Sequence, residues 1–267
     1  MIKVAVLGAS GRMGRAVLGS LDKSADLMLS GALTESTDPF LGRDACESAG
    51  LAPQGVLLTD DRTQALLGAQ VAVDFTLPAA VGANLAACVQ NGAALVIGTT
   101  GLDTQHMQAI ERAAREIPIV YARNMSVGMN LFMELVARAA ATLDDGYDVE
   151  IIEAHHRHKV DAPSGTALAL GERVAAAKGR RLEEVAVRCR DGNIGPRVPA
   201  TIGFSVIRGG NIVGEHSVLF IAPEEQLELR HRAQDRAAFA NGALHAARWL
   251  AGRAPGLYSM SDVLGLA

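Results

Sequence analysis

The chain has 267 residues, of which 49% are hydrophobic and 20% are charged, and its formal net charge is −4. This balance excludes a disordered chain and is typical of a globular protein with one large or two medium domains. A net negative charge provides no basic field for binding nucleic acid. The cysteines Cys46, Cys88 and Cys189 form no CxxC pair, which indicates a reducing compartment and no zinc site. No apolar run reaches about 18 residues, so we expect a cytoplasmic protein that does not span a membrane.

The N-terminal segment has the pattern of a strand, a glycine turn and a helix. Residues 2–7 are a short apolar run typical of a buried parallel strand, and residues 15–21 have a helical pattern. Gly8, Gly11 and Gly14 lie between them with GxxGxxG spacing, a variant of the commoner GxGxxG. Glycines at such a turn let the backbone approach a pyrophosphate, which binds the N–H groups that open the helix. The context predicts a dinucleotide site, and the alternative is a plain turn.

A second strand, residues 27–33, ends beside an acid. Thr34 and Glu35 follow the glycines by about 20 residues, where a dinucleotide fold has an acid for the ribose hydroxyls. Glu35 is therefore a candidate for that contact. No lysine or arginine directly follows it to bind a 2′-phosphate, although Arg12 in the glycine turn is a second candidate. NADH and NADPH both stay open, with NAD slightly favoured.

Strand and helix patterns then alternate up to about Ser126. They occupy residues 70–75, 80–91, 94–97, 102–116 and 118–121. This alternation predicts an α/β fold, a Rossmann-like doubly wound parallel sheet. The polar loops that follow the strands then lie at the carboxyl edge of the sheet, where ligands bind. Cys88 falls inside one of the helices, so we expect no cysteine nucleophile.

The pattern changes after Ser126. A long helical pattern at residues 127–143 precedes a strand-like run at 148–152 and a helix from Ser164. Further strand patterns occupy residues 200–208, 212–221 and 225–232, and the first two are separated by Gly209-Gly210-Asn211, a strong hairpin signal. We therefore predict a second α+β domain on a mainly antiparallel sheet, with one face buried and the other wet or paired with another subunit.

A final helical pattern at residues 239–250 is expected to pack back on the first domain. The predicted boundaries give a dinucleotide-binding domain of residues 1–126 plus 235–267. Residues 127–234 then form a substrate-binding and oligomerisation domain.

The densest chemistry lies in residues 153–166, EAHHRHKVDAPSGT. Three histidines, an arginine and a lysine occupy five consecutive positions ahead of a helix N-terminus, which predicts a site for an anionic substrate. The alternative is a solvated basic loop. The run lacks the HExxH spacing that places two metal ligands on one helix face, so we expect no metal.

Taken together, these motifs resemble the dihydrodipicolinate reductases, also named 4-hydroxy-tetrahydrodipicolinate reductases, of bacterial lysine and diaminopimelate synthesis. The matching segments span nearly the whole chain and include GASGRMGR, VDFTLP, VIGTTGL, ARNMSVGMNL, EIIEAHHRHKVDAPSGTAL and SMSDVLGL. The resemblance implies hydride transfer from NADH or NADPH to a cyclic imine dicarboxylate, giving tetrahydrodipicolinate. It also implies a homotetramer assembled through the sheet of the second domain.

The resemblance implies roles for single residues. His155 and Lys159 match the family's proton-handling pair, and His156, Gly165 and Thr166 match its contacts to the substrate carboxylates. Four segments match the cofactor contacts: Gly8, Ala9, Ser10, Gly11, Arg12 and Met13; Thr34 and Glu35; Gly98, Thr99 and Thr100; Ala122, Arg123, Asn124 and Met125. Relatives often have an acid followed by arginine where this chain has Thr34 and Glu35, which leaves the cofactor preference open.

The chemistry needs a proton donor, because reduction produces an electron-rich enamine. His155 titrates near neutral pH if unperturbed, and Lys159 serves as well if desolvation lowers its pKa. The sequence does not choose between them. Glu153 and Asp161 are expected to orient the basic residues through hydrogen bonds. The alternatives are another two-domain NAD(P)-dependent reductase of a small amino acid-like substrate or aldehyde, a metal hydrolase, and a non-catalytic NAD(P)H sensor.

Overall fold

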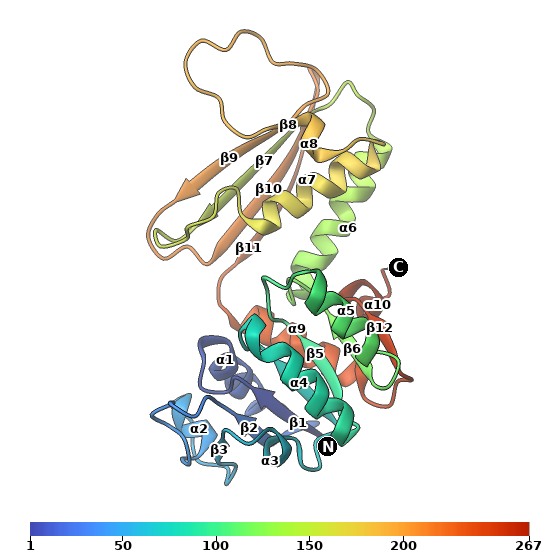
Figure 1. Cartoon of the computed structure of the whole chain (residues 1–267). Helices are drawn as coiled ribbons and strands as arrows, with labels where there is room; N and C mark the ends of the chain where they lie inside the picture. Colours follow the sequence, from blue (N-terminus) through green and yellow to red (C-terminus); the bar gives the residue numbers. More distant parts are fainter. Residues whose placement is uncertain (267) are drawn as a thin grey trace. The chain divides into compact units, whose positions relative to one another are not determined.

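The computed structural model describes residues 1–266, which form two compact units (Figure 1). Unit 1 comprises Met1–Val127 and the C-terminal segment from Arg236, and unit 2 comprises Gly128–Asp235. Within residues 1–266, no helix combines the length and the apolar character needed to cross a membrane.

Unit 1 is built on a parallel sheet. Over the described residues its strands are β1 (Ile2–Leu7), β2 (Leu27–Leu33), β3 (Leu58–Thr59), β4 (Val71–Asp74), β5 (Ala94–Ile97), β6 (Pro118–Tyr121) and β12 (Gly256–Tyr258). They lie in the order β12-β6-β5-β4-β1-β2-β3. The chain leaves β1 toward β2 on one side and reaches β4 on the other, so the strand order reverses at β1. Ligands bind at such a switch point, and the predicted doubly wound α/β fold is confirmed.

Helices cover both faces of this sheet. They are α1 (Arg12–Leu21), α9 (Ala237–Leu250) and α10 (Met260–Leu264) on one face, and α3 (Arg62–Leu66), α4 (Pro78–Asn91) and α5 (Thr104–Ala113) on the other. The short helix α2 (Ala45–Ser48) follows β2. Because both faces are covered, β4 and β5 are buried at every position, which accounts for their unbroken apolar sequences. The predicted return of the C-terminal helix to the first unit is confirmed.

The glycine turn after β1 brings α1 against the turn backbone. Helix α1 begins at Arg12, earlier than the sequence pattern predicted. Gly8 has a φ of +78°, which favours glycine, and a Cβ on Gly14 would lie 2.1 Å from the Gly8 carbonyl oxygen. The first and third glycines of the motif therefore have structural reasons: one makes the turn, and the other allows the close approach of helix and turn.

We expect Gly14→Ala to lower the free energy of unfolding by about 2–3 kcal/mol, because α1 must move away from backbone atoms that cannot yield. Gly19→Ala is a matched control, since Gly19 lies in the same helix and a Cβ there meets nothing within 4 Å. That change is expected to stabilise the protein by about 0.5–1 kcal/mol. Urea unfolding of both variants measures the difference, and equal stabilities would contradict the packing argument.

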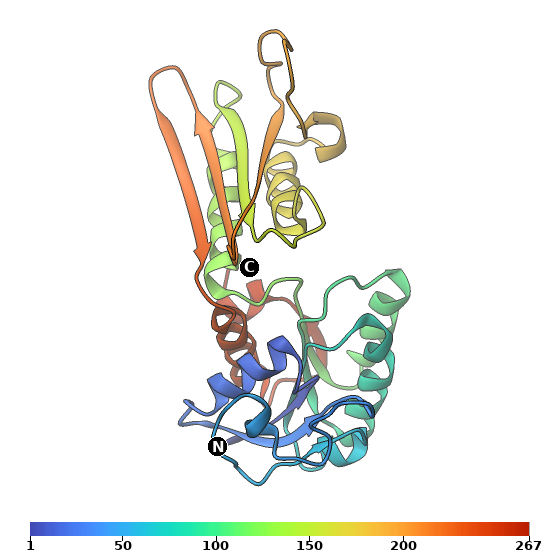
Figure 2. The ribbon, with the colours of Figure 1, turned by 90° about the vertical axis from the view of Figure 1, so that its left-hand side faces the viewer.

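Unit 2 contains a mixed sheet. Its strands are β7 (Asp148–His155), β8 (Ala186–Val187), β9 (Ile202–Arg208), β10 (Gly214–Ile221) and β11 (Gln226–Ala233), in the order β11-β10-β7-β9-β8. Pairs β10/β11 and β10/β7 are antiparallel, whereas β7/β9 and β8/β9 are parallel. A hairpin does join β10 to β11, the two long orange strands of Figure 2.

The hairpin predicted at Gly209-Gly210-Asn211 is wrong. Strand β7 lies between β9 and β10, so the connection crosses the end of β7 instead of joining paired neighbours. The Gly209 N–H donates to the carbonyl of His155, and the Arg157 N–H donates to the carbonyl of Gly210. Residues 209–211 therefore do form a glycine turn, but its backbone makes hydrogen bonds with the end of β7 and the basic stretch that follows it.

Helices α6 (Val127–Thr142), α7 (Gly165–Ala177) and α8 (Leu182–Val185) supply the other side of the unit 2 core. Met129 and Phe132 of α6 lie in this core and are 2% and 5% exposed. Strand residues such as Ile151, Phe204 and Val218 face these helices. The intervening residues of the strands face the opposite side of the sheet.

Candidate functional site

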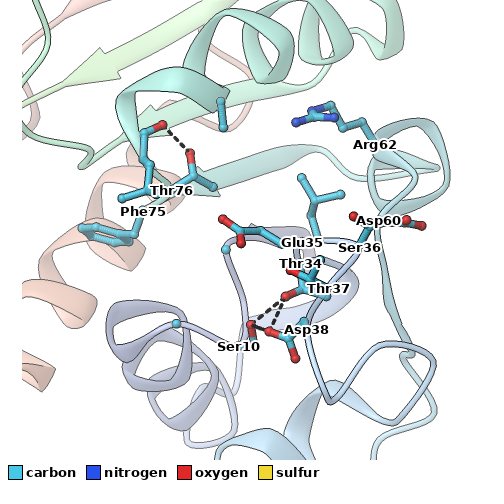
Figure 3. Close-up of a pocket in the computed structure, with 15 residues that line it drawn as sticks. Ser10, Thr34, Glu35, Ser36, Thr37, Asp38, Asp60, Arg62, Phe75 and Thr76 are labelled. Atoms are coloured by element: carbon cyan, nitrogen blue, oxygen red, sulfur yellow. Dashed lines mark hydrogen bonds between the residues drawn. The ribbon is translucent and has the colours of Figure 1, made fainter.

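A cavity of about 750 Å³ lies at the carboxyl edge of the unit 1 sheet. It is lined by the glycine turn after β1, by residues 34–38 after β2, by Asp60 and Arg62, and by residues 75–77 after β4 (Figure 3). Five predicted cofactor residues line it: Gly8, Ser10, Gly11, Thr34 and Glu35. The strand ends thus bring together segments that are far apart in sequence.

The other predicted cofactor residues do not line this cavity. They are Ala9, Arg12, Met13, Gly98, Thr99, Thr100, Ala122, Arg123, Asn124 and Met125. Met13 and Met125 pack into the hydrophobic core, whereas Arg12 and Arg123 are exposed. Their cofactor role stays a prediction.

A buried carboxylate joins two of the predicted loops. Asp74 is fully buried at the end of β4, and its Oδ1 accepts from the Thr76 N–H at 2.8 Å, the Thr76 hydroxyl at 2.6 Å and the Thr99 hydroxyl at 3.2 Å. Its Oδ2 accepts from Asn84 Nδ2 at 2.9 Å. Asp74 therefore fixes the loop after β4 against the loop after β5, a structural reason for an acid at the end of an otherwise apolar strand.

Asp38, an acid that the sequence analysis did not single out, lines the cavity. The Asp38 carboxylate accepts hydrogen bonds from Ser10 Oγ and Thr34 Oγ1, and its Oδ1 accepts from the Phe40 N–H at 2.7 Å. Burial favours a higher pKa for Asp38, but these three donors hold the pKa below its usual value. We call Ser10, Thr34 and Asp38 the hydroxyl–carboxylate cluster. The prediction considered only the acid directly after the strand, Glu35, which is exposed.

In unit 2, the basic stretch begins on a strand. Strand β7 continues to His155, beyond the predicted end at residue 152. Alternate residues of a strand share a face, so Glu153 and His155 point the same way. His155 Nδ1 lies 2.6 Å from Glu153 Oε2. The expected orienting hydrogen bond from Glu153 is present, and it engages the Nδ1 of the His155 ring.

Glu153 is the centre of this group. Its side chain is 1% exposed, and Arg208 binds both carboxylate oxygens at 2.7 Å, while the Ser164 N–H donates to Oε1 at 2.9 Å. Burial favours a higher pKa for Glu153, but hydrogen bonds from Arg208, His155 and the Ser164 backbone hold it below its usual value. Arg208 was missed because it reaches the site only through the pairing of β9 with β7, a register that no local sequence pattern carries.

The imidazole of His216 packs against His155 from the neighbouring strand β10. The two ring centres are 5.2 Å apart, and His216 Nε2 lies 3.2 Å from Ser164 Oγ. His216 is 4% exposed, and burial, with a smaller effect from the charge of His155, lowers its pKa to about 3. His216 is therefore neutral at pH 7, and its ring packs edge-on against that of His155.

This pKa predicts acid sensitivity. Between pH 6.5 and 3 the unfolded chain protonates His216 and the folded chain does not, so the stability present above pH 6.5 is lost as the pH falls. We expect His216 to contribute a loss of about 2 kcal/mol at pH 5. Unfolding of the wild type and of His216→Gln, measured at several pH values, should show a flatter dependence in the variant; parallel curves would contradict the assignment.

The segment between His155 and α7 is a loop. Helix α7 begins at Gly165, and the Ser164 side chain caps it by accepting from the Ala167 N–H. Lys159 Nζ lies 2.8 Å from Asp161 Oδ1, so the second expected orienting contact is also present. The His156 ring is partly buried, and Gly165 is exposed at the helix N-terminus.

His155 has a lowered pKa. Burial is the main cause, and the positive charges of Lys159 and Arg208 act in the same direction, while the hydrogen bond and charge of Glu153 oppose them. His155, Lys159 and the N-terminus of α7 thus bring together an imidazole ring, a cation and the N–H groups that open a helix, of which the Gly165 N–H donates to Asp161. Such a set has the chemistry to bind a carboxylate and to exchange a proton.

Known proteins match the whole chain. A family model described as "Dihydrodipicolinate reductase, N-terminus" matches residues 2–125, and one described as "Dihydrodipicolinate reductase, C-terminus" matches residues 128–264. The chain belongs to the dihydrodipicolinate reductase family. A 4-hydroxy-tetrahydrodipicolinate reductase of Thiobacillus denitrificans is 54% identical over 99% of both chains. One of Nitrosomonas eutropha is 51% identical over 100% of this chain and 99% of its own.

Solved structures agree in fold. A dipicolinate-bound dihydrodipicolinate reductase from Paenisporosarcina sp. TG-14 superposes with a TM-score of 0.76 at 24% identity, covering 98% of each chain. A probable dehydrogenase from Thermotoga maritima gives 0.62 at 11% identity, covering 98% of this chain and 92% of that one. Dihydrodipicolinate reductases are NADH- or NADPH-dependent oxidoreductases of lysine and diaminopimelate synthesis, so the predicted family, enzyme class and cofactor class are confirmed.

Proposed function

We propose that this dihydrodipicolinate reductase reduces 4-hydroxy-tetrahydrodipicolinate to tetrahydrodipicolinate with His155 and Lys159 as its proton-handling pair. The observation that carries the proposal is the arrangement in unit 2. There, the buried Glu153–Arg208 ion pair fixes the ring of His155 at the end of β7, and the loop that carries Lys159 leads to the N-terminus of α7.

The cavity of unit 1 fits a nicotinamide dinucleotide. Gly8 and Gly14 bring the start of α1 close to the turn, which leaves backbone N–H groups for a pyrophosphate. Ser10, Thr34 and Glu35 line the side of the cavity where a ribose would bind. The bound cofactor supplies the hydride, and the glycine turn with residues 34–38 holds its adenosine half.

The dicarboxylate binds through charges and backbone donors of unit 2. Lys159 supplies a point charge, His156 a ring donor, and Gly165 and Thr166 the N–H groups at the start of α7. A substrate carboxylate competes with Asp161 for Lys159, since these two side chains are 2.8 Å apart. The helix end contributes about 0.3–1 kcal/mol, which orients the substrate more than it tightens binding.

Proton transfer follows from the environment of His155. Its Nδ1 faces Glu153, so Nε2 is the atom that takes up and releases a proton. A substrate carboxylate that offsets the charge of Lys159 removes one of the causes that lower the pKa of His155. Substrate binding then favours the protonated ring, and Glu153 stabilises it until the proton passes to the reduced substrate.

We also propose a cytoplasmic homotetramer assembled through the sheet of unit 2. The side of this sheet away from α6 and α7 presents Ile207, which is 51% exposed, beside charged residues such as Glu215 and Arg230. A mixed apolar and charged sheet face suits a subunit interface. Light scattering coupled to size exclusion measures the mass; a monomer of 27.9 kDa would contradict this part of the proposal.

The test of the activity follows the absorbance of NADH and NADPH in parallel. The unstable substrate is made in the assay from pyruvate and aspartate semialdehyde by its synthase. Oxidation that depends on the synthase supports the reductase. Cofactor binding without oxidation, with an active relative as positive control, would instead favour the non-catalytic sensor.

A further inference from the structure

We infer that Asp38 accepts the ribose hydroxyls of the cofactor's adenosine half and that the hydroxyl–carboxylate cluster makes this protein select NADH over NADPH. The inference deepens the proposed function and rests on its placement of the dinucleotide in the unit 1 cavity.

The hydroxyl–carboxylate cluster has fewer hydroxyl protons than oxygen–oxygen contacts. Ser10 Oγ lies 2.6 Å from Thr34 Oγ1, and both oxygens lie within hydrogen-bond distance of Asp38 Oδ2. The three contacts among these oxygens share two hydroxyl protons, because the Asp38 carboxylate, whose pKa is held below its usual value, brings none. The two hydroxyl donors of the cluster are therefore used within the cluster. Asp38 Oδ1 accepts one hydrogen bond, from the Phe40 N–H, and has a second lone pair available.

A group that binds here must donate. The 2′- and 3′-hydroxyls of NADH each bring a proton to the cluster. The 2′-phosphate of NADPH brings only acceptor oxygens and up to two negative charges, and it finds neither a donor nor a cation in the cluster. A fixed carboxylate beside it adds repulsion.

The rest of the lining favours the same cofactor. Glu35, Asp38 and Asp60 contribute carboxylates to the described lining, against the single guanidinium of Arg62. Figure 3 shows Arg62 on the opposite side of the cavity from the cluster, and its Nε donates to Asn84 Oδ1 at 2.9 Å. Arg15, on α1, stacks on the ring of Phe40 with its Cζ 5.3 Å from the ring centre.

Asp38→Asn is the informative variant. An asparagine keeps the size of the side chain and an acceptor for the Phe40 N–H, but it removes the charge and adds an NH₂ donor to the cluster. Asp60→Asn removes one carboxylate charge from the lining of the same cavity and leaves the cluster intact. A general effect of cavity charge changes the ratio of NADH to NADPH affinity in both variants. A specific acceptor role of Asp38 changes that ratio only in Asp38→Asn.

The experiment is calorimetric titration of the wild type and both variants with NADH and with NADPH, without substrate. We expect wild-type protein to bind NADH roughly 10- to 100-fold more tightly, the strength of a hydrogen bond to a charged group. Asp38→Asn should reduce this ratio by roughly 10-fold or more. Asp60→Asn should change it much less.

Equal wild-type affinities for the two cofactors, or equal responses of the two variants, would overturn the inference and leave the proposed function standing. Binding of neither cofactor would instead overturn the cofactor site itself, and the inference with it. Competition between 5′-AMP and 2′,5′-ADP on wild-type protein tests the same contrast if Asp38→Asn does not fold. Tighter binding of 2′,5′-ADP would contradict the role of Asp38.

Discussion

Replacing His155 or Lys159 by alanine is expected to lower turnover by roughly 10²–10⁴-fold, the usual contribution of one general acid. His155→Ala removes the ring that Glu153 orients, and Lys159→Ala removes the cation that binds a substrate carboxylate. Both residues lie in unit 2, so NADH affinity should stay at the wild-type value. Steady-state rates and cofactor titrations separate the two effects.

Val160→Ala is the matched control for these variants, because Val160 lies in the same loop and is 98% exposed. Its turnover should equal that of the wild type. The two catalytic variants also distinguish the roles: loss of the His155 ring should lower kcat mainly, whereas loss of Lys159 should raise KM as well. Near-wild-type turnover in both alanine variants would remove the basis of the site assignment.

Glu153→Ala is expected to lower the free energy of unfolding by about 3 kcal/mol and to abolish most of the activity. The change leaves the Arg208 guanidinium, which is 19% exposed, and the Ser164 N–H without their acceptor, and unpairing a buried charge has a cost of this size. Activity falls because His155 loses the carboxylate that sets its ring orientation. Chemical unfolding and the reductase assay on one preparation measure both effects.

Glu134→Ala provides the comparison, because Glu134 lies on α6 of the same unit and pairs at 3.7 Å with Arg173, and the two side chains are 38% and 45% exposed. Exposed pairs contribute about 0–1 kcal/mol, so this variant should lose little stability. Similar losses of stability in the two variants would show that burial does not make the Glu153–Arg208 pair more important than an exposed pair.

Local sequence patterns were sufficient to predict most of the long strands of unit 1. Apolar runs and glycine turns gave β1, β2, β5 and β6 with their observed bounds, since each is buried on both faces and ends in a polar loop. The segment between β2 and β4, with its short α2, β3 and α3, was not predicted. These elements have two to five residues each, too few for a periodic pattern.

The site was predicted only where its residues are adjacent in sequence. His155, Lys159, Glu153 and Asp161 lie in one stretch, and the structure pairs His155 with Glu153 and Lys159 with Asp161, as expected. Arg208 joins them through parallel pairing across more than 50 positions, and no local pattern carries such a register. The glycine turn after β9 has the signature of a hairpin whichever strand lies beside it.

Helix α9 gives unit 1 a discontinuous chain, with a consequence for biosynthesis. The N-terminal strands β4 and β5 depend on this helix for part of their apolar cover, yet the ribosome makes it only after all of unit 2. Unit 2 is contiguous and can complete its core first. During translation the apolar strands of the N-terminal segment therefore stay partly uncovered until α9 has been made. We expect the nascent chain to depend most on a chaperone during this interval.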